Sequence, residues 1–174
     1  LHSVTERDYL SRVNDKSYPK PKASSLARKF DFDYWDGDRR INYGGYRFIP
    51  GRFSSVADRF VDRYSLDSGM RVLDIGCGKG FQLAEIKMRH PALELHGIDI
   101  SSYAVRNSHE SVRENIVLGS AEDLPFPDDY FDFVFSLNTL HNLTNPQLEK
   151  ALKEITRVAK GGRSYICVES FRNI

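Results

Sequence analysis

The residues best able to do chemistry lie in one short segment, VLDIGCGKG, from Val72 to Gly80. An apolar run there enters a turn with glycines at positions 76, 78 and 80, which let the backbone turn tightly and approach a ligand closely. A helix is expected next, and its N-terminus presents unpaired N–H groups at the same place. Asp74 stands at the end of the apolar run. The segment therefore predicts a ligand-binding loop between a strand and a helix.

The carboxylate of Asp74 bears on what this loop binds. A dinucleotide loop has the spacing GxGxxG, whereas the third glycine here comes one residue early. A carboxylate beside the loop would repel a pyrophosphate and would suit a cationic ligand, one that bears an ammonium or a sulfonium. Asp74 could also simply cap the following helix. The spacing and the charge together favour a cationic ligand over a nicotinamide dinucleotide.

The elements that must position this loop follow from the hydrophobic pattern after residue 70. Short apolar runs alternate with amphipathic stretches, which is typical of βαβ units and a parallel sheet. Strands are expected at 71–75, 93–98, 116–118, 131–135 and 163–168. Helices are expected at 79–90, at 101–113, and from Asn145 to the glycines at 161 and 162. The first of these helices is expected to bury Phe81, Leu83, Ala84 and Met88.

The N-terminal part of the chain has a different character. We expect a short helix at 4–13, and we expect the prolines at 19 and 21 to break regular structure in the segment that follows it. A further helix is expected at 54–64, capped by Ser54 or Ser55. Between them, 30–53 is rich in aromatic residues, Asp, Arg and Gly without a clear period. We therefore expect two parts: an N-terminal helical and irregular cover or lid at 1–68, and an α/β core at 69–174.

Several interpretations of the cover are open. The aromatic and arginine-rich stretch 43–52 could stack on nucleic-acid bases, pack as a plain cover, or close over a cofactor and substrate with Tyr43, Tyr46 and Arg47 as contacts. The lid or cover is favoured. Four aspartates at 31, 33, 36 and 38 lack the spacing and the glutamate of a calcium loop, so no metal site is expected.

Further motifs after the glycine loop carry a resemblance to a known family. These are HGIDIS, SAEDLPFPDDYFDFVFS, LNTLHNL and KEITRVAKGG, in this order from residue 96 to residue 162. With the loop, they resemble the class I S-adenosylmethionine-dependent methyltransferases, in the small-molecule branch that includes the ubiquinone-biosynthesis type. The resemblance implies a Rossmann-like, doubly wound, mostly parallel α/β sheet. It also implies S-adenosyl-L-methionine as cofactor and S-adenosyl-L-homocysteine as product.

The resemblance assigns the cofactor's two ends to different segments. Asp74 and the glycines at 76, 78 and 80 would hold the methionine part, with Cys77 inside the loop, although a small buried thiol is the plainer interpretation of Cys77. Asp99 would accept hydrogen bonds from the ribose hydroxyls, and Ile100 would lie beside the adenine. The remaining cofactor positions are Ala121 and Glu122 at the adenine edge, and Ser136, Leu137 and Asn138 at the methionine moiety and methyl.

His141 follows the fourth expected strand, close to the expected methyl position. An imidazole titrates in the range that general-base catalysis needs, so His141 is the candidate catalytic residue; the alternative is that it orients its loop or packs. The sequence departs from the family at Ser120, where many relatives have an acid or amide that contacts the adenine amino group. It also has AKGG at 159–162, where relatives often have LKPGG.

Composition narrows the class of protein. The 174 residues include 25 Lys and Arg against 24 Asp and Glu, a net charge of +1, and 40% are hydrophobic. This balance predicts a folded globular chain and disfavours a protein that acts mainly on the nucleic-acid backbone. No apolar run is long enough to span a membrane, and the two cysteines have no CxxC partner, so a cytoplasmic location is expected.

The resemblance also indicates which partners to expect, namely a methyl acceptor and a second copy of the chain. A small-molecule methyl acceptor is implied, whereas its identity cannot be deduced. Five strands are expected where relatives have seven, so we expect either that the natural chain continues past Ile174 or that a second copy covers the open edge as a homodimer. Two alternatives stay open: a non-catalytic module that binds S-adenosylmethionine or a partner, and a nicotinamide-dependent oxidoreductase.

Overall fold

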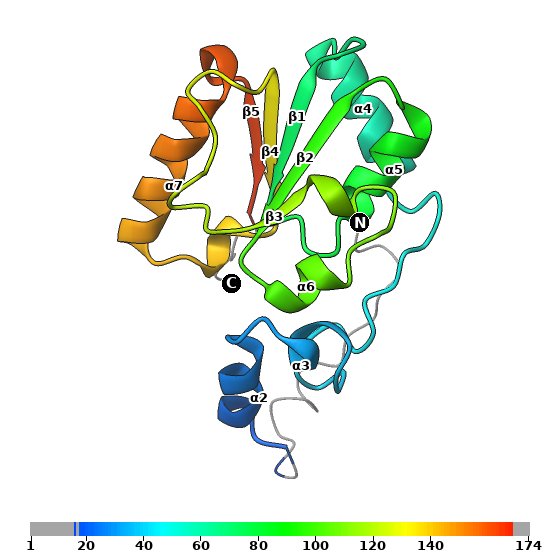
Figure 1. Cartoon of the computed structure of the whole chain (residues 1–174). Coiled ribbons are helices and arrows are strands. Elements are labelled where there is room, and N and C mark those ends of the chain that lie inside the picture. The colour runs from blue at the N-terminus through cyan, green and yellow to red at the C-terminus, as the bar shows by residue number, and fades with distance from the viewer. Residues whose placement is uncertain (1–15, 17, 169–174) are drawn as a thin grey trace, which may run out of the picture. The chain divides into compact units, whose positions relative to one another are not determined.

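The computed structural model describes residue 16 and residues 18–168 (Figure 1). The helix expected at 4–13 lies outside these residues. The chain divides into two compact units, Leu1–Arg47 and Phe48–Ile174. Each unit is described separately below.

The second unit is built on a sheet of five parallel strands among the described residues. The strands are β1 (Arg71–Ile75), β2 (Glu94–Asp99), β3 (Ile116–Leu118), β4 (Phe133–Leu137) and β5 (Ser164–Cys167), and their order in the sheet is β3-β2-β1-β4-β5. At the β5 edge, β4 is the strand paired with β5 in the part of the chain that the structure describes. The parallel α/β fold expected from the sequence is confirmed.

Helices cover both faces of this sheet (Figure 1). Helices α4 (Ser54–Tyr64) and α5 (Phe81–Arg89) pack on one face, and α7 (Asn145–Val158) packs on the other. The connections contain the short helix α6 (Ser102–Arg106) and the 3₁₀ turns η1 (Arg113–Asn115), η2 (Leu140–Asn142) and η3 (Lys160–Gly162). The sheet is therefore doubly wound.

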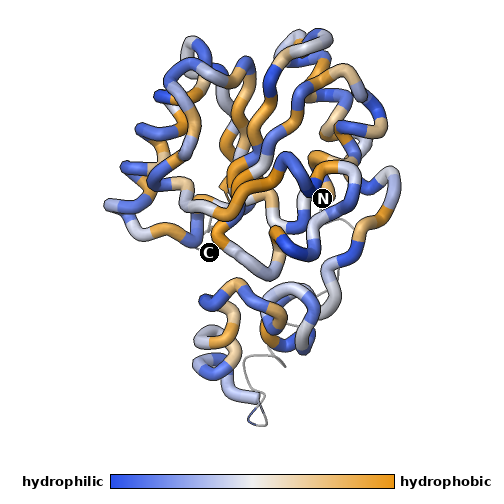
Figure 2. The backbone as a smooth tube through the Cα atoms, viewed as in Figure 1, coloured by the Kyte–Doolittle hydropathy of each residue, from blue (hydrophilic) through white to orange (hydrophobic). Residues whose placement is uncertain are grey.

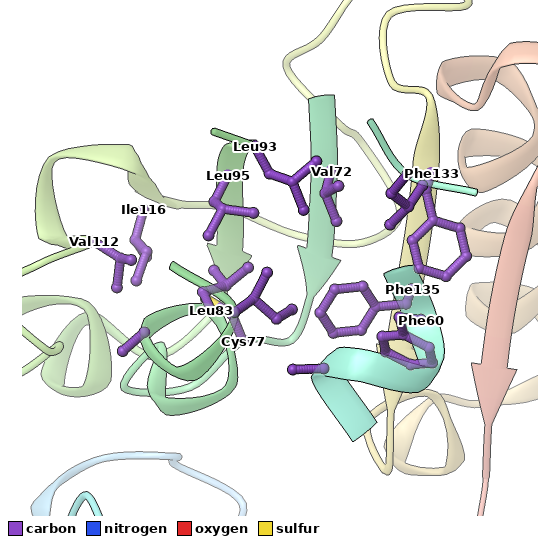
Figure 3. Close-up of a cluster of buried hydrophobic side chains, with 14 residues drawn as sticks. Phe60, Val72, Cys77, Leu83, Leu93, Leu95, Val112, Ile116, Phe133 and Phe135 are labelled. Carbon is purple, nitrogen blue, oxygen red and sulfur yellow. The ribbon is translucent and has the colours of Figure 1, made fainter. Parts of the chain in front are cut away.

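The hydrophobic core lies in two layers, one on each face of the sheet. Under α4 and α5, the ring centroid of Phe60 lies 5.3 Å from that of Phe133 and 5.0 Å from that of Phe135 (Figure 3). Under α7, the other layer contains Leu73, Phe131 and Ile155 among its buried residues. Figure 2 shows the hydrophobic residues concentrated along the strands. Strands buried on both faces explain why their sequences are continuous apolar runs.

Two expected elements differ from those in the structure. The helix expected at 101–113 ends at Arg106, because the backbone of Asn107 leaves the helical conformation (φ −103°, ψ 23°), and Asn107 Nδ2 also donates to the carbonyl of Tyr103, 2.8 Å away. The fourth strand begins at Phe133 instead of residue 131, because the Phe131 N–H donates to the carbonyl of Val158 and so pairs with the end of α7.

Two expectations about helices were wrong, one about the buried face of α5 and one about the N-cap of α4. Met88 is 52% exposed, whereas Glu85 on the same helix is buried. The Glu85 carboxylate accepts hydrogen bonds from the Gly51 N–H (2.9 Å) and from Ser54 Oγ (2.6 Å), which makes its burial tolerable. Ser54 therefore binds α5 and does not cap α4, whose N-cap residue is Phe53.

The first unit has a small aromatic core of its own. It contains α2 (Lys20–Ala27) and α3 (Phe32–Trp35), and the prolines at 19 and 21 begin α2 instead of breaking a helix. The ring of Trp35 stacks on Tyr43 at 5.3 Å, and Tyr43 lies 4.5 Å from Tyr46. The division into 1–68 and 69–174 stays a prediction; in the structure α4 packs within the second unit through Phe60.

Candidate functional site

The site is set by the strand order. In a sheet ordered β3-β2-β1-β4-β5, the connections after β1 and β4 leave toward opposite faces, and ligands of such sheets bind at the carboxyl ends beside this switch point. The loop after β1, the end of β2 and the loop after β4 are therefore neighbours. Most of the residues proposed from the sequence lie in these three segments.

The glycine loop is fixed to the end of β2 by its backbone. The N–H groups of Gly76 and Cys77 donate to the carbonyl of Ile98, at 2.8 and 3.2 Å. Gly76 has φ of +76°, and a Cβ there would lie 2.2 Å from atoms of the Thr139 side chain. Gly80 has φ of +68°, and its Cβ would lie 2.5 Å from Ile116 Cδ1. Both positions require glycine because of conformation and space.

Asp99 joins this loop to the following helix. Its Oδ2 accepts from the Gly78 N–H at 2.6 Å, and its Oδ1 accepts from the Ser101 N–H at 2.8 Å. Burial raises the pKa of Asp99, while these two hydrogen bonds act in the opposite direction. A carboxylate has about four lone-pair sites, so each oxygen retains capacity for a further donor. The acceptor sites that remain fit a ligand with two hydroxyl groups, such as a ribose.

Asp74 and Cys77 are buried at the same strand ends. Burial, and next the nearby charge of Asp99, raise the pKa of Asp74 well above its usual range. Burial, reinforced by both carboxylates, also raises the pKa of the Cys77 thiol. The side chain of Cys77 lies in the hydrophobic layer beside Leu83 (Figure 3), so its thiol packs in the core. Two buried carboxylates favour a positively charged group nearby.

After β4, the predicted residues take different roles. Ser136 is fully buried and its Oγ donates to the carbonyl of Ile75, 2.8 Å away, so the hydroxyl ties β4 to β1. Leu137 is half-buried. Asn138 is exposed, has φ of +53°, and donates its N–H to the carbonyl of Cys167 at 2.7 Å. The sharp turn at Asn138 directs the chain back toward the glycine loop.

Two residues of the next turn complete this side of the site. Thr139 was not predicted; its Oγ1 lies 3.3 Å from the carbonyl oxygens of both Gly76 and Leu137, within hydrogen-bonding range. No sequence signal marks Thr139 as part of the site, because its role comes from its contact with Gly76 in the folded chain. His141 lies in η2 and is exposed, and within the part of the chain that the structure describes no hydrogen bond orients its ring. Its side chain is accessible to an acceptor molecule.

The residues expected at the adenine edge lie on the other side of the loop. Ile100 is 63% exposed, and Ala121 and Glu122 are half-buried. The Glu122 N–H donates to Ser120 Oγ at 3.1 Å, and Glu122 Oε1 accepts from Gln147 Nε2 at 2.9 Å. Gln147 was also missed, although the pattern Thr-x-x-Gln at a helix start was visible in the sequence.

The motif KEITRVAKGG anchors the segment that follows Glu122. Glu154 Oε2 accepts from the Leu124 N–H at 2.8 Å. The Arg157 guanidinium donates to the carbonyls of Leu124 and Phe126, at 2.9 and 2.7 Å, and forms ion pairs with Asp128 and Glu154. Side chains of α7 therefore hold the segment 124–128, which follows the expected adenine edge.

Three remaining predictions concern other parts of the chain. Tyr46 lies in the first unit against Trp35 and Tyr43, and its contact with a cofactor stays a prediction. Among the described residues, no group of three His, Cys, Asp or Glu side chains could hold a metal ion. A search of the same residues finds no helix with the length and apolar character needed to cross a membrane.

Known proteins are similar to the part of this chain that contains the glycine loop and the sheet. A family model described as a methyltransferase domain matches residues 73–167. Among curated proteins, a demethylmenaquinone methyltransferase of Anoxybacillus flavithermus is 34% identical over 117 residues, 63% of this chain and 48% of that protein. The chain thus spans about half the length of the first curated relatives it matches.

Solved structures give the same result for the fold. A SAM-dependent methyltransferase from Aquifex aeolicus is 32% identical, with a TM-score of 0.52, and the match covers 64% of this chain and 63% of that one. A chain described as the (4+2)-cyclase SpnF is 30% identical, with a TM-score of 0.54 over 62% of this chain and 41% of that one. These matches confirm the resemblance that the sequence motifs indicated.

Proposed function

Because the chain belongs to the methyltransferase domain family, we propose that it transfers the methyl group of S-adenosyl-L-methionine to a small-molecule acceptor. The observation that carries the proposal is the glycine loop held between two buried carboxylates. Asp74 precedes the loop, and Asp99 binds the Gly78 N–H from the next strand. This arrangement suits a ligand that combines a ribose with a cationic group, and it disfavours a pyrophosphate.

In this proposal the glycine loop and Asp74 hold the methionine part. The raised pKa of Asp74 means that its carboxylate gains from a nearby ammonium or sulfonium. Asp99 binds the ribose hydroxyls through its remaining lone pairs, with Ile100 beside the adenine. The turn at Ala121 and Glu122 borders the adenine edge.

The chemistry that the cofactor supplies when bound is an electrophilic methyl group on a sulfonium. The tasks of the chain are then to place an acceptor in line with that group and to exclude water. Leu137 ends β4 on the methyl side and Asn138 follows it, while Ser136 holds β4 against β1. His141 accepts a proton from the acceptor only where the nucleophile arrives protonated, as a hydroxyl does.

Calorimetric titration and a transfer assay test the proposal together. We expect S-adenosyl-L-homocysteine to bind saturably and NADH not to bind. Asp99→Asn should weaken S-adenosyl-L-homocysteine binding about tenfold or more, because a hydrogen bond to a charged acceptor contributes roughly 1.5–3 kcal/mol. Saturable NADH binding without a response to either sulfur ligand would reject the proposal in favour of an oxidoreductase.

Turnover separates an enzyme from a silent binder. Related chains carry names that include quinone, sterol and fatty-acid methyltransferases, so these three acceptor classes are the first to screen with a labelled methyl donor. The screen is needed because one similar chain is described as a cyclase. Binding without transfer to any acceptor would favour a module that retains the cofactor loop alone.

Two further expectations belong to the same proposal. The edge strand β5 offers a surface for a homodimer, which sedimentation of the purified chain tests directly. A cytoplasmic location agrees with a reaction on small metabolites, and fractionation of expressing cells tests it.

A further inference from the structure

One side chain joins the two loops that flank the glycine loop. Gln147 is the third residue of α7, and its amide forms hydrogen bonds in two directions. Its Oε1 accepts from the N–H and the Oγ1 of Thr144, at 3.0 and 2.8 Å. Its Nε2 donates to Glu122 Oε1 at 2.9 Å. A residue that would otherwise only cap a helix is thereby bonded to the adenine-side turn.

Glu122 is held at both ends by these contacts. Its N–H donates to Ser120 Oγ, and its Oε1 accepts a hydrogen bond from Gln147 Nε2. Among the described residues, Glu122 Oε2 accepts no hydrogen bond. The turn thus presents a half-buried carboxylate with one oxygen still able to accept from an amine.

Ser120 strengthens the case for this carboxylate. The hydroxyl of Ser120 is bonded to the Glu122 N–H, so it serves the turn itself. An exocyclic amine bound at this edge therefore has Glu122 as its charged acceptor. Hydrogen bonds to charged acceptors are about twice as strong as those between neutral groups.

Gln147 also reaches the opposite side of the site. Thr144, its capping partner, ends the loop that starts at Asn138 after β4 and carries His141. Glu122 and His141 are 19 positions apart in sequence and belong to segments assigned to opposite ends of the cofactor. The Gln147 amide is a direct bridge between these segments.

We propose that Gln147 is a positioning residue that orients Glu122 toward the amino group of adenine and keeps this turn in register with the loop that carries His141. This inference rests on the proposed function, because it assumes an adenine-containing cofactor. Its role differs from that of Asp99, since Gln147 acts only through Glu122.

The variant Gln147→Glu isolates this role. A glutamate keeps the side-chain oxygen that accepts from the N–H of the N-cap residue Thr144, so the N-terminus of α7 stays capped. It removes the donor to Glu122 and places a second carboxylate against the first. At about pH 8 we expect S-adenosyl-L-homocysteine to bind about tenfold more weakly than to wild type. Near pH 5 the loss should largely disappear, because two adjacent carboxylates share a proton that restores the hydrogen bond.

Two further variants complete the design. Lys150→Gln, on an exposed position of the same helix, changes the net charge by the same amount and should leave the affinity unchanged at both pH values. The double variant Glu122→Gln with Gln147→Glu exchanges donor and acceptor across this contact. It should recover part of the affinity at pH 8, because an oxygen still faces the amine but no longer carries a charge. Melting temperatures of all variants show whether α7 stays intact.

The outcomes separate the two proposals. Wild-type chain that does not bind S-adenosyl-L-homocysteine would overturn the proposed function and, with it, the role of Gln147. Wild-type binding together with a Gln147→Glu affinity that matches Lys150→Gln at both pH values would overturn the positioning role alone. A pH-dependent loss that the double variant rescues supports it, because a purely structural defect would not be repaired by exchanging the two groups.

Discussion

The substitution Gly76→Ala tests how tightly the loops after β1 and β4 pack. The added Cβ would lie 2.2 Å from Thr139 Cγ2 and Oγ1, far inside van der Waals contact. An alanine in the left-handed region costs about 1–2 kcal/mol, and overpacking a close contact costs about 1–3 kcal/mol more. The expected loss of about 2–5 kcal/mol is a large part of the roughly 5–15 kcal/mol by which domains are stable.

The chain offers a matched control in Gly69→Ala. Gly69 has φ of +79°, close to the +76° of Gly76, but a Cβ there meets nothing within 4 Å. This control therefore carries the conformational cost of about 1–2 kcal/mol without the overlap. Urea unfolding followed by circular dichroism measures both variants. The excess loss in Gly76→Ala over Gly69→Ala is the cost of the contact with Thr139.

A double-mutant cycle completes the test. Adding Thr139→Gly to Gly76→Ala removes the overlapping atoms, so the two changes should show a coupling energy of at least about 1 kcal/mol. Equal losses in Gly76→Ala and Gly69→Ala, within about 0.5 kcal/mol, would refute the close packing of the two loops.

Three further predictions concern charge and proton transfer. The pKa of Asp74 is raised in the folded chain, so its contribution to stability is complete below the unfolded value of 3.8 and is lost as pH rises through the folded value. Asp74→Asn should therefore gain melting temperature over wild type as pH rises above about 4, by calorimetry without ligand, and a constant difference would contradict this. His141→Ala should slow methyl transfer to a hydroxyl acceptor about 100-fold in a labelled-methyl assay while S-adenosyl-L-homocysteine affinity stays unchanged, whereas equal rates would reject the general base. Arg157→Lys should lower the free energy of unfolding by about 1–3 kcal/mol, because lysine cannot hold Leu124, Phe126 and Glu154 together, whereas the exposed control Arg59→Lys should cost nearly nothing.

The strands and the glycine loop were predictable because their signals are local. Strands buried on both faces are mostly apolar, so β1 is visible as the short run RVLDI that ends at the loop. Helix α7 was visible from the three- and four-residue spacing of its apolar side chains, with Asn145 and Pro146 at its start. Asp99 followed from the strand end about 20 residues beyond the loop.

The residues that the sequence did not reveal depend on contacts between distant segments. Thr139 meets Gly76 across 63 positions, and Gln147 meets Glu122 across 25. Glu85 is buried because Ser54 and Gly51 bind it, a partnership that no helical periodicity encodes. In each case the side chain type is unremarkable by itself, and its role comes from the partner that the fold supplies.

The strand order explains why these distant contacts converge on one loop. With β1 between β2 and β4, the loop that follows β1 is reached from both sides: Asp99 binds the Gly78 N–H from β2, and Thr139 lies against Gly76 from the loop after β4. A change on either side is therefore transmitted to the same few backbone atoms. Affinity for S-adenosyl-L-homocysteine should respond to substitutions at Thr139 as well as at Asp99, although by this reasoning only Asp99 touches the cofactor. Substitutions at both residues should also lower the free energy of unfolding, because Thr139 packs against Gly76 and Asp99 binds the N–H groups of Gly78 and Ser101.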